Sequence, residues 1–75
     1  MKKELQSCAE IGSLVHELRK SQKVTQAQLA GIANTGVRFI SDLENGKETC
    51  HTGKMLRVFA ALGVGIYIHS PFDKE

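Results

Sequence analysis

The segment from residue 25 to residue 47 constrains the fold of this chain more than any other. Thr25 is followed three positions later by Gln28, a reciprocal pair that caps the start of a helix. Apolar residues then recur at helical spacing in two stripes. These residues are Leu29, Ala30 and Ala33 in the first stripe and Val37, Ile40 and Leu43 in the second. Since Asn34 separates the stripes and Asn45-Gly46 ends the second, the pattern predicts two short helices joined by a tight turn.

The small side chain of Ala30 refines this prediction. Two helices that cross steeply leave little room between them, and Ala30 fits such a crossing. The predicted arrangement is a helix-turn-helix, whose second helix typically enters the major groove of DNA. The segment therefore indicates a DNA-binding domain.

The other elements are predicted from the same periodicity. Ser7 and Glu10 form a second capping pair, so we expect a helix at 8–20, followed by helices at 26–33, 36–44 and 52–62. The side chains expected to be buried in the first and last helices are Ile11, Leu14, Val15, Leu18, Met55, Leu56, Phe59 and Leu62. Residues 64–69 are rich in β-branched and aromatic side chains, which predicts a strand that Pro71 ends.

Length and composition set further limits. A chain of 75 residues forms one small domain. Such a domain buries about 60–65% of its unfolded surface, which helices alone or with a partner subunit can provide. No apolar run is long enough to span a membrane, and the segment after Met1-Lys2-Lys3 is too polar for a signal peptide. We therefore expect a cytoplasmic protein that does not bind membranes.

The positions of the charged residues are more informative than the net charge. A net charge of +2 does not indicate nucleic-acid binding by itself. Basic residues are nevertheless grouped near the motif, at Arg19, Lys20, Lys23, Arg38 and Lys47. The acidic residues fall mostly elsewhere. Any one of these charges could be an ordinary solvated side chain, but the group as a whole favours a DNA contact.

Cysteine, histidine and nucleophilic residues do not form a chemical site. Cys8 and Cys50 imply no disulfide in a reducing compartment, and Cys50 is better explained by core packing. The three histidines His16, His51 and His69 are scattered, and no set has the spacing of a metal site. No nucleophile–base pair or phosphate-binding loop is present either. We expect neither an enzyme nor a bound cofactor.

Several of these residues together resemble the Xre family of phage repressors, the lambda repressor-like helix-turn-helix proteins. They are Gln26, Leu29, Ala30, Ile40, Ser41, Leu43 and the run Glu44-Asn45-Gly46-Lys47. The resemblance covers about residues 8 to 64. Within the family, the opening Ser7 with Glu10-Ile11-Gly12 and the ending Ala61-Leu62-Gly63 before a short strand resemble HipB-type antitoxins.

The resemblance implies a fold and a division of the chain. The expected fold is all-α, a bundle of four to five short helices with a C-terminal β-strand that forms an intermolecular sheet in a dimer. Residues 1–64 would be the helix-turn-helix DNA-binding domain. Residues 65–75 would be the strand and tail used for dimerisation.

Two positions of the turn depart from the family pattern. The family usually has Gly where Asn34 stands, and Asn is the other residue that best tolerates a left-handed backbone. The family usually has Ser, Thr or Lys where Gly36 stands. Glycine has no side chain to cap a helix or contact a base, so direct readout at this position is in doubt.

The base-reading residues are expected on the exposed side of the helix at 36–44. Arg38 can donate two hydrogen bonds to guanine O6 and N7, which provides about 1–3 kcal/mol of discrimination. Val37 can pack on a thymine methyl group, Ser41 can reach a base or phosphate, and Asp42 can accept from cytosine N4. The alternative for Arg38 is a phosphate contact or a solvated side chain.

Phosphate contacts and one structural contact complete the expected site. Phosphate-binding residues are expected at Gln26, Gly36 and Lys47, with Lys23, Thr25 and Arg57 as weaker candidates. The family implies the same role for Gln26. It also implies an ion pair between Arg19 and Glu44 that joins the first helix to the end of the third and orients the reading helix.

The tail suggests a dimer. A lone strand leaves its amides and carbonyls unpaired, which pairing with a second chain would correct. The residues expected in this pairing are Gly65, Ile66, Tyr67, Ile68 and His69. HipB-type proteins dimerise in a similar way. The alternative is a tail that folds back on its own core or is disordered.

The leading functional hypothesis is a dimeric repressor that binds a palindromic double-stranded DNA operator and acts as the antitoxin of a toxin–antitoxin pair. By resemblance, its toxin would be a HipA-type serine/threonine kinase. One alternative is a stand-alone phage or mobile-element regulator, or the antitoxin of an unrelated toxin. Another is a protein-interaction module that has lost DNA binding.

Overall fold

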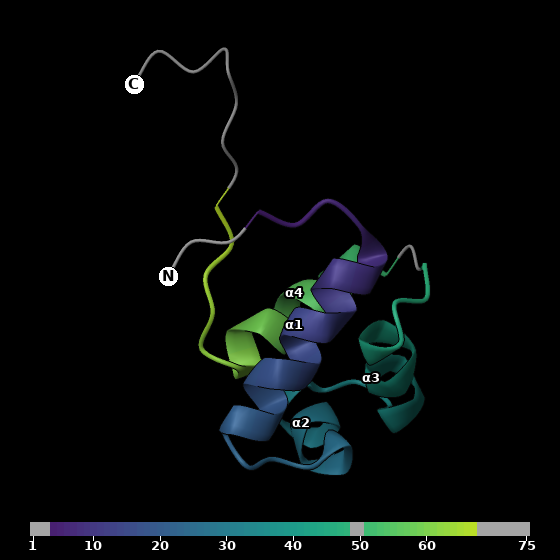
Figure 1. The fold of residues 1–75 in the computed structure, drawn as a ribbon. Helices are drawn as coiled ribbons and strands as arrows, with labels where there is room; N and C mark the ends of the chain where they lie inside the picture. Colours follow the sequence, from purple (N-terminus) through teal and green to yellow (C-terminus); the bar gives the residue numbers. More distant parts are fainter. Residues whose placement is uncertain (1–3, 49–50, 68–75) are drawn as a thin grey trace.

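The computed structural model describes residues 4–48 and 51–67, and these residues form four helices (Figure 1). The helices are α1 (Cys8–Ser21), α2 (Gln26–Ala33), α3 (Val37–Glu44) and α4 (Thr52–Ala61). Within the described ranges there is no strand, and the all-α class expected from the sequence is confirmed. None of these helices has the length and apolar character needed to cross a membrane.

The core lies where the four helices meet. Its most deeply buried large side chains come one from each helix: Val15, Leu29, Ile40 and Val58. Around them, α1 packs against α3, and α2 packs against both α3 and α4. The core therefore fixes the position of α3 from two sides.

The two predicted helix caps form to different extents. Thr25 and Gln28 make the full reciprocal pair, with the Thr25 hydroxyl 3.0 Å from the Gln28 amide and the Gln28 side chain 2.8 Å from the Thr25 amide. At α1 the Ser7 hydroxyl accepts from the Glu10 amide at 3.2 Å. The Glu10 carboxylate, however, accepts from the amide of Gln6 and not from that of Ser7. Of the two reciprocal hydrogen bonds predicted between Ser7 and Glu10, only one is therefore formed.

The turn between α2 and α3 has the left-handed geometry expected of it. Asn34 lies at φ 58° and ψ 51°, as the sequence predicted. The amide of Thr35 donates to the Ala30 carbonyl at 2.9 Å, which closes the end of α2. α3 begins at Val37, one residue later than predicted, because Gly36 takes the N-cap position and has an extended backbone.

Two glycines permit α1 to approach the end of α3. A Cβ at Gly12 would overlap the backbone oxygens of Leu43 and Glu44. Gly46, just after α3, has φ +76°, and a Cβ there would lie 2.9 Å from Cα of Ala9. Both helix backbones therefore touch where side chains would otherwise separate them.

α4 and the segment after it differ from the sequence-based expectation. α4 ends at Ala61, with Leu62 as its C-cap, one residue earlier than predicted. Leu56, predicted to be buried, is 47% exposed, and Val58 is fully buried in the core. Residues 64–67 have no strand pairing in the single chain. Ile68, His69 and Cys50 lie outside the described residues, and a sheet between two chains stays a prediction.

Candidate nucleic-acid interface

α3 separates its buried side from a polar, exposed side. Ile40 and Leu43 lie in the core, whereas Val37 is 46% exposed and Arg38 is exposed. In the part of the chain that the structure describes, the Arg38 guanidinium has no hydrogen bond or ion pair. The first turn of α3 therefore presents an apolar group and a five-donor guanidinium to solvent.

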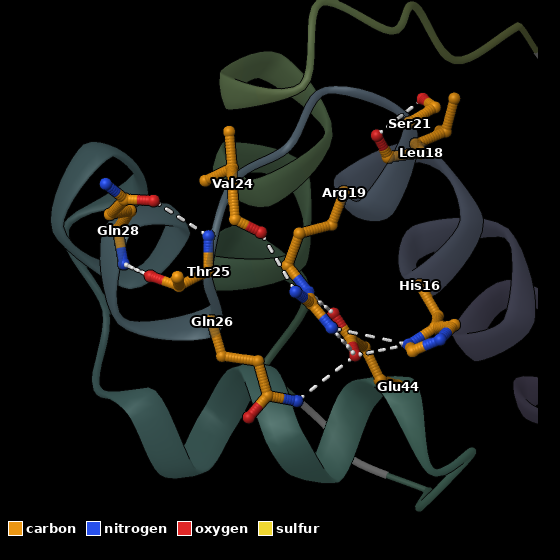
Figure 2. A network of polar contacts seen from close by, with 9 residues as sticks. All are labelled: His16, Leu18, Arg19, Ser21, Val24, Thr25, Gln26, Gln28 and Glu44. Carbon is orange, nitrogen blue, oxygen red and sulfur yellow. Dashed lines mark hydrogen bonds and ion pairs between the residues drawn. The ribbon is translucent and has the colours of Figure 1, made fainter.

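The opposite end of α3 is held by a buried ion pair (Figure 2). Arg19 Nε lies 2.5 Å from Glu44 Oε2, and Arg19 Nη2 lies 3.0 Å from Oε1, so the contact is bidentate. The two side chains are only 10% and 5% exposed. Arg19 Nη1 also donates to the Val24 carbonyl at 2.9 Å. The ion pair expected between Arg19 and Glu44 is thus present, and it also reaches the loop before α2.

Two further residues join this ion pair. His16 Nδ1 lies 3.0 Å from Glu44 Oε1, and Gln26 Nε2 donates to the same oxygen at 3.1 Å (Figure 2). The His16 side chain is 52% exposed and lies at the edge of this network. Glu44 therefore connects α3 to α1 through His16 and Arg19, and to α2 through Gln26.

The ionisation of the pair follows from these contacts. Burial raises the pKa of Glu44, but hydrogen bonds from Arg19, His16 and Gln26 outweigh it and lower the pKa to about 2. The hydrogen bond from Arg19 to Glu44 raises the pKa of Arg19. Both groups are therefore charged at neutral pH.

The expected phosphate-binding residues lie at helix starts and in adjacent loops. Gln26 is the first residue of α2 and Gly36 is the N-cap of α3, two positions where free backbone amides favour an anion. The Thr25 hydroxyl already accepts from the α2 backbone. Lys23 is exposed in a left-handed conformation with φ 58°. Lys47 Nζ lies 3.8 Å from Asp42 Oδ2, a loose contact between exposed groups.

Arg57, one of the weaker phosphate candidates, contacts the end of α2. Its Nε donates to the Ala33 carbonyl at 3.0 Å, and its Nη2 donates to the Asn34 carbonyl at 3.4 Å. The side chain thus reaches from α4 to the end of α2. Nothing in the local sequence pattern around Arg57 indicates this contact, because it depends on how α4 packs against α2.

Phe39 is a further contact that sequence reasoning did not single out. Its half-buried ring meets the His51 ring edge-on, with centroids 6.2 Å apart, and Lys54 Nζ lies 5.7 Å from its centroid. These contacts join α3 to the start of α4. They leave the outer side of α3 uncovered.

This fold, with an exposed helix after a tight turn, defines the class of helix-turn-helix DNA-binding regulators. A model of the helix-turn-helix family HTH_3 matches residues 15–67. An uncharacterized HTH-type transcriptional regulator, y4mF, of Sinorhizobium fredii is 46% identical over 75 residues, which is 100% of this chain and 99% of that protein. The chain therefore belongs to the helix-turn-helix family, in its Xre-type form, and is a DNA-binding regulator and not an enzyme.

Solved structures share the same fold. A structure described as MDT Protein superposes with a TM-score of 0.83 and 16% identity, over 93% of this chain and 99% of the other. A chain in a structure of a HipA-HipB-O2-O3 complex gives the same values. At this identity the likeness concerns the fold, which is that of HipB-type proteins.

Proposed function

We propose that this protein is a sequence-specific repressor that inserts α3 into the major groove of a palindromic operator. The observation that carries the proposal is the asymmetry of α3. Its first turn exposes Val37 and Arg38, while its last residue, Glu44, is fixed by Arg19. A reading helix needs an exposed, uncommitted surface on a rigid support.

The residues of α3 have separate roles in this proposal. Arg38 donates to guanine O6 and N7, and Val37 packs on a thymine methyl group. Ser41 and Asp42 are partly exposed one turn further along and contact neighbouring base edges. The loose contact of Asp42 with Lys47 is easily exchanged for a contact with DNA.

A second group of residues binds the DNA backbone and sets the register of α3. The group consists of Lys23, Thr25, Gln26, Gly36 and Lys47. Gln26 uses one amide hydrogen for Glu44 and has a second for a phosphate oxygen. Gly36 contributes only its backbone amide.

The repressor acts as a homodimer. Two reading helices must be placed about 34 Å apart to contact successive major grooves. Ile66 and Tyr67 are 47% and 92% exposed, which supports burial of residues 65–69 against a second chain. Residues 1–64 then form the DNA-binding domain and residues 65–75 the dimerisation segment.

The protein also serves as the cytoplasmic antitoxin of a HipA-type serine/threonine kinase. The support for this step is the similarity of its fold to a chain in a HipA-HipB-O2-O3 complex. The competing proposal is a stand-alone regulator without a toxin. Co-purification of the tagged full-length protein with the product of the adjacent gene separates the two. A stable complex with a kinase-like protein supports the antitoxin role, and recovery of the repressor alone overturns it.

DNA binding is tested by the salt dependence of a gel-shift titration with the DNA upstream of the gene. Phosphate contacts release counterions, so the logarithm of the affinity should fall linearly with the logarithm of salt concentration. We expect this upstream DNA to compete better than a random duplex of the same length. Equal competition by both duplexes would overturn sequence-specific binding.

A further inference from the structure

We propose that Arg57 is a positioning residue that fixes the α2–α3 turn and thereby the angle at which α3 meets DNA. This inference rests on the proposed DNA-binding function. Arg57 belongs to α4, yet its guanidinium contacts two successive carbonyls of the turn, those of Ala33 and Asn34. Among the residues that the structure describes, Arg57 is the only charged side chain of α4 that contacts this turn.

The end of α2 explains why such a contact is needed. Asn34 is left-handed, and its amide and that of Thr35 turn back to carbonyls within α2. Among the described residues, no backbone amide outside the helices donates to the carbonyls of Ala33 and Asn34, which accept from Arg57 instead. A cation placed there satisfies both acceptors and offsets the partial negative charge of the helix terminus.

The N-cap of α3 contributes no side-chain contact of its own. Gly36 is its N-cap and provides no side-chain hydrogen bond, and there is nothing within 4 Å of the place its Cβ would occupy. The other end of α3 is fixed by the Arg19–Glu44 ion pair. Arg57 therefore constrains the turn that leads into α3, in addition to the Phe39 contacts in the first turn of the helix and the Arg19–Glu44 pair at its end.

The contact requires the shape of a guanidinium. Its N–H groups have a fixed fork geometry, so two of them can reach neighbouring carbonyls at once. A lysine ammonium keeps the charge but is a point donor on a flexible stem. Arg57→Lys and Arg57→Met therefore separate the shape of the group from its charge.

The experiment compares both variants with the wild-type full-length protein and with Lys20→Met. Lys20 is an exposed cation at the end of α1 and controls for the loss of one charge. The probes are a palindromic duplex that the wild type selects from random oligonucleotides and a random duplex of equal length. Both affinities are measured over a series of salt concentrations, well below the melting temperature of each protein.

We expect both Arg57 variants to bind the selected duplex about tenfold more weakly, the effect of disturbing about one base contact. Affinity for the random duplex and the salt slope should stay unchanged in the Arg57 variants. Lys20→Met removes a cation of the basic group, so it should change both affinities alike and keep the wild-type ratio of specific to random affinity. A role in stability alone would leave the ratio of specific to random affinity unaltered. If Arg57→Met does not fold, Arg57→Lys decides the question by itself.

Two results would overturn the inference. One is wild-type binding by Arg57→Lys together with a salt slope reduced by about one unit in Arg57→Met, which identifies a phosphate contact. The other is an unchanged affinity ratio in both variants. If the wild type binds no duplex, the proposed function fails, and amide exchange then tests the positioning role. Faster exchange at Thr35 in Arg57→Lys than in the wild type supports it, and equal exchange overturns it.

Discussion

At the scale of single residues, Glu44 has the most consequential position. One carboxylate accepts hydrogen bonds from three side chains on two other helices, Arg19 and His16 on α1 and Gln26 on α2. Its low exposure makes the loss of any partner costly, because a buried charge would then be left without compensation. The network therefore favours one orientation of α3.

This network makes the free energy of unfolding depend on pH in the acidic range. The pKa of Glu44 is about 2 in the folded protein and near 4.5 when unperturbed. A carboxyl group whose folded pKa is depressed stabilises the fold above its unfolded pKa, and this contribution is lost as the pH falls from 4.5 toward 2. The lost contribution is about 3 kcal/mol. Urea denaturation of the wild type and Glu44→Gln over this pH range measures it.

We expect the free-energy difference between the wild type and Glu44→Gln to shrink as the pH falls. The matched control is Glu17→Gln, which changes an exposed carboxylate of α1 that forms no ion pair with the described residues. Its difference from the wild type should stay near zero. A constant Glu44 difference from pH 5 to pH 2 would contradict the role given to the network.

Two glycines with the same backbone angle give a second test at this scale. Gly46 and Gly63 both have φ +76°, but only at Gly46 does a Cβ meet a neighbour, Cα of Ala9. We expect Gly63→Ala to lower the free energy of unfolding by about 1 kcal/mol, because of the left-handed backbone alone. Gly46→Ala should cost more. If chemical denaturation gave the same loss of unfolding free energy for both variants, the close contact between Gly46 and α1 would not restrict the side chain at this position.

At the scale of helices, the close contact between α1 and α3 predicts that a side chain at Gly12 destabilises the fold. Gly12→Ala would place a methyl group against the carbonyls of Leu43 and Glu44, and we expect a loss of about 2 kcal/mol in stability and weaker operator binding. Gly31→Ala is the control, since α2 leaves open space there and alanine favours a helix by about 1 kcal/mol. The midpoint of thermal melting should fall in Gly12→Ala and rise in Gly31→Ala. A rise in both would contradict the observed helix contact.

The sequence predicts those parts of the fold that depend on local signals. The Thr25–Gln28 cap, the left-handed Asn34 and the ends of α2 were all predictable from spacings of a few residues. The Arg19–Glu44 pair was predictable only through a family resemblance, because 25 residues separate its members. The burial of Ile40 and Leu43 followed from helical periodicity.

The remaining features depend on how helices pack, which no local pattern contains. Because α4 has many apolar positions, its sequence pattern does not indicate which of Leu56 and Val58 is buried in the core. The contacts of Gln26 and His16 with Glu44 depend on the crossing of three helices. Arg57 reaches the turn only because α4 lies against α2.

At the scale of the whole molecule, the proposed dimer predicts a loss of DNA binding without its tail. Deletion of the residues after Gly63 should yield a monomer, because it removes the exposed Ile66 and Tyr67 together with the rest of the pairing segment. Light scattering coupled to size exclusion measures the mass of both proteins. Wild-type protein that is monomeric at micromolar concentration would contradict the dimer.

The placement of α3 in the major groove is tested most directly by methylation interference, because guanine N7 lies in that groove. We predict that methylation at one symmetric pair of guanines blocks binding of the wild-type protein. In Arg38→Ala that interference should disappear, while the remaining contacts keep the same footprint. Binding that tolerates N7 methylation at every guanine, or an interference pattern unchanged in Arg38→Ala, would contradict the account.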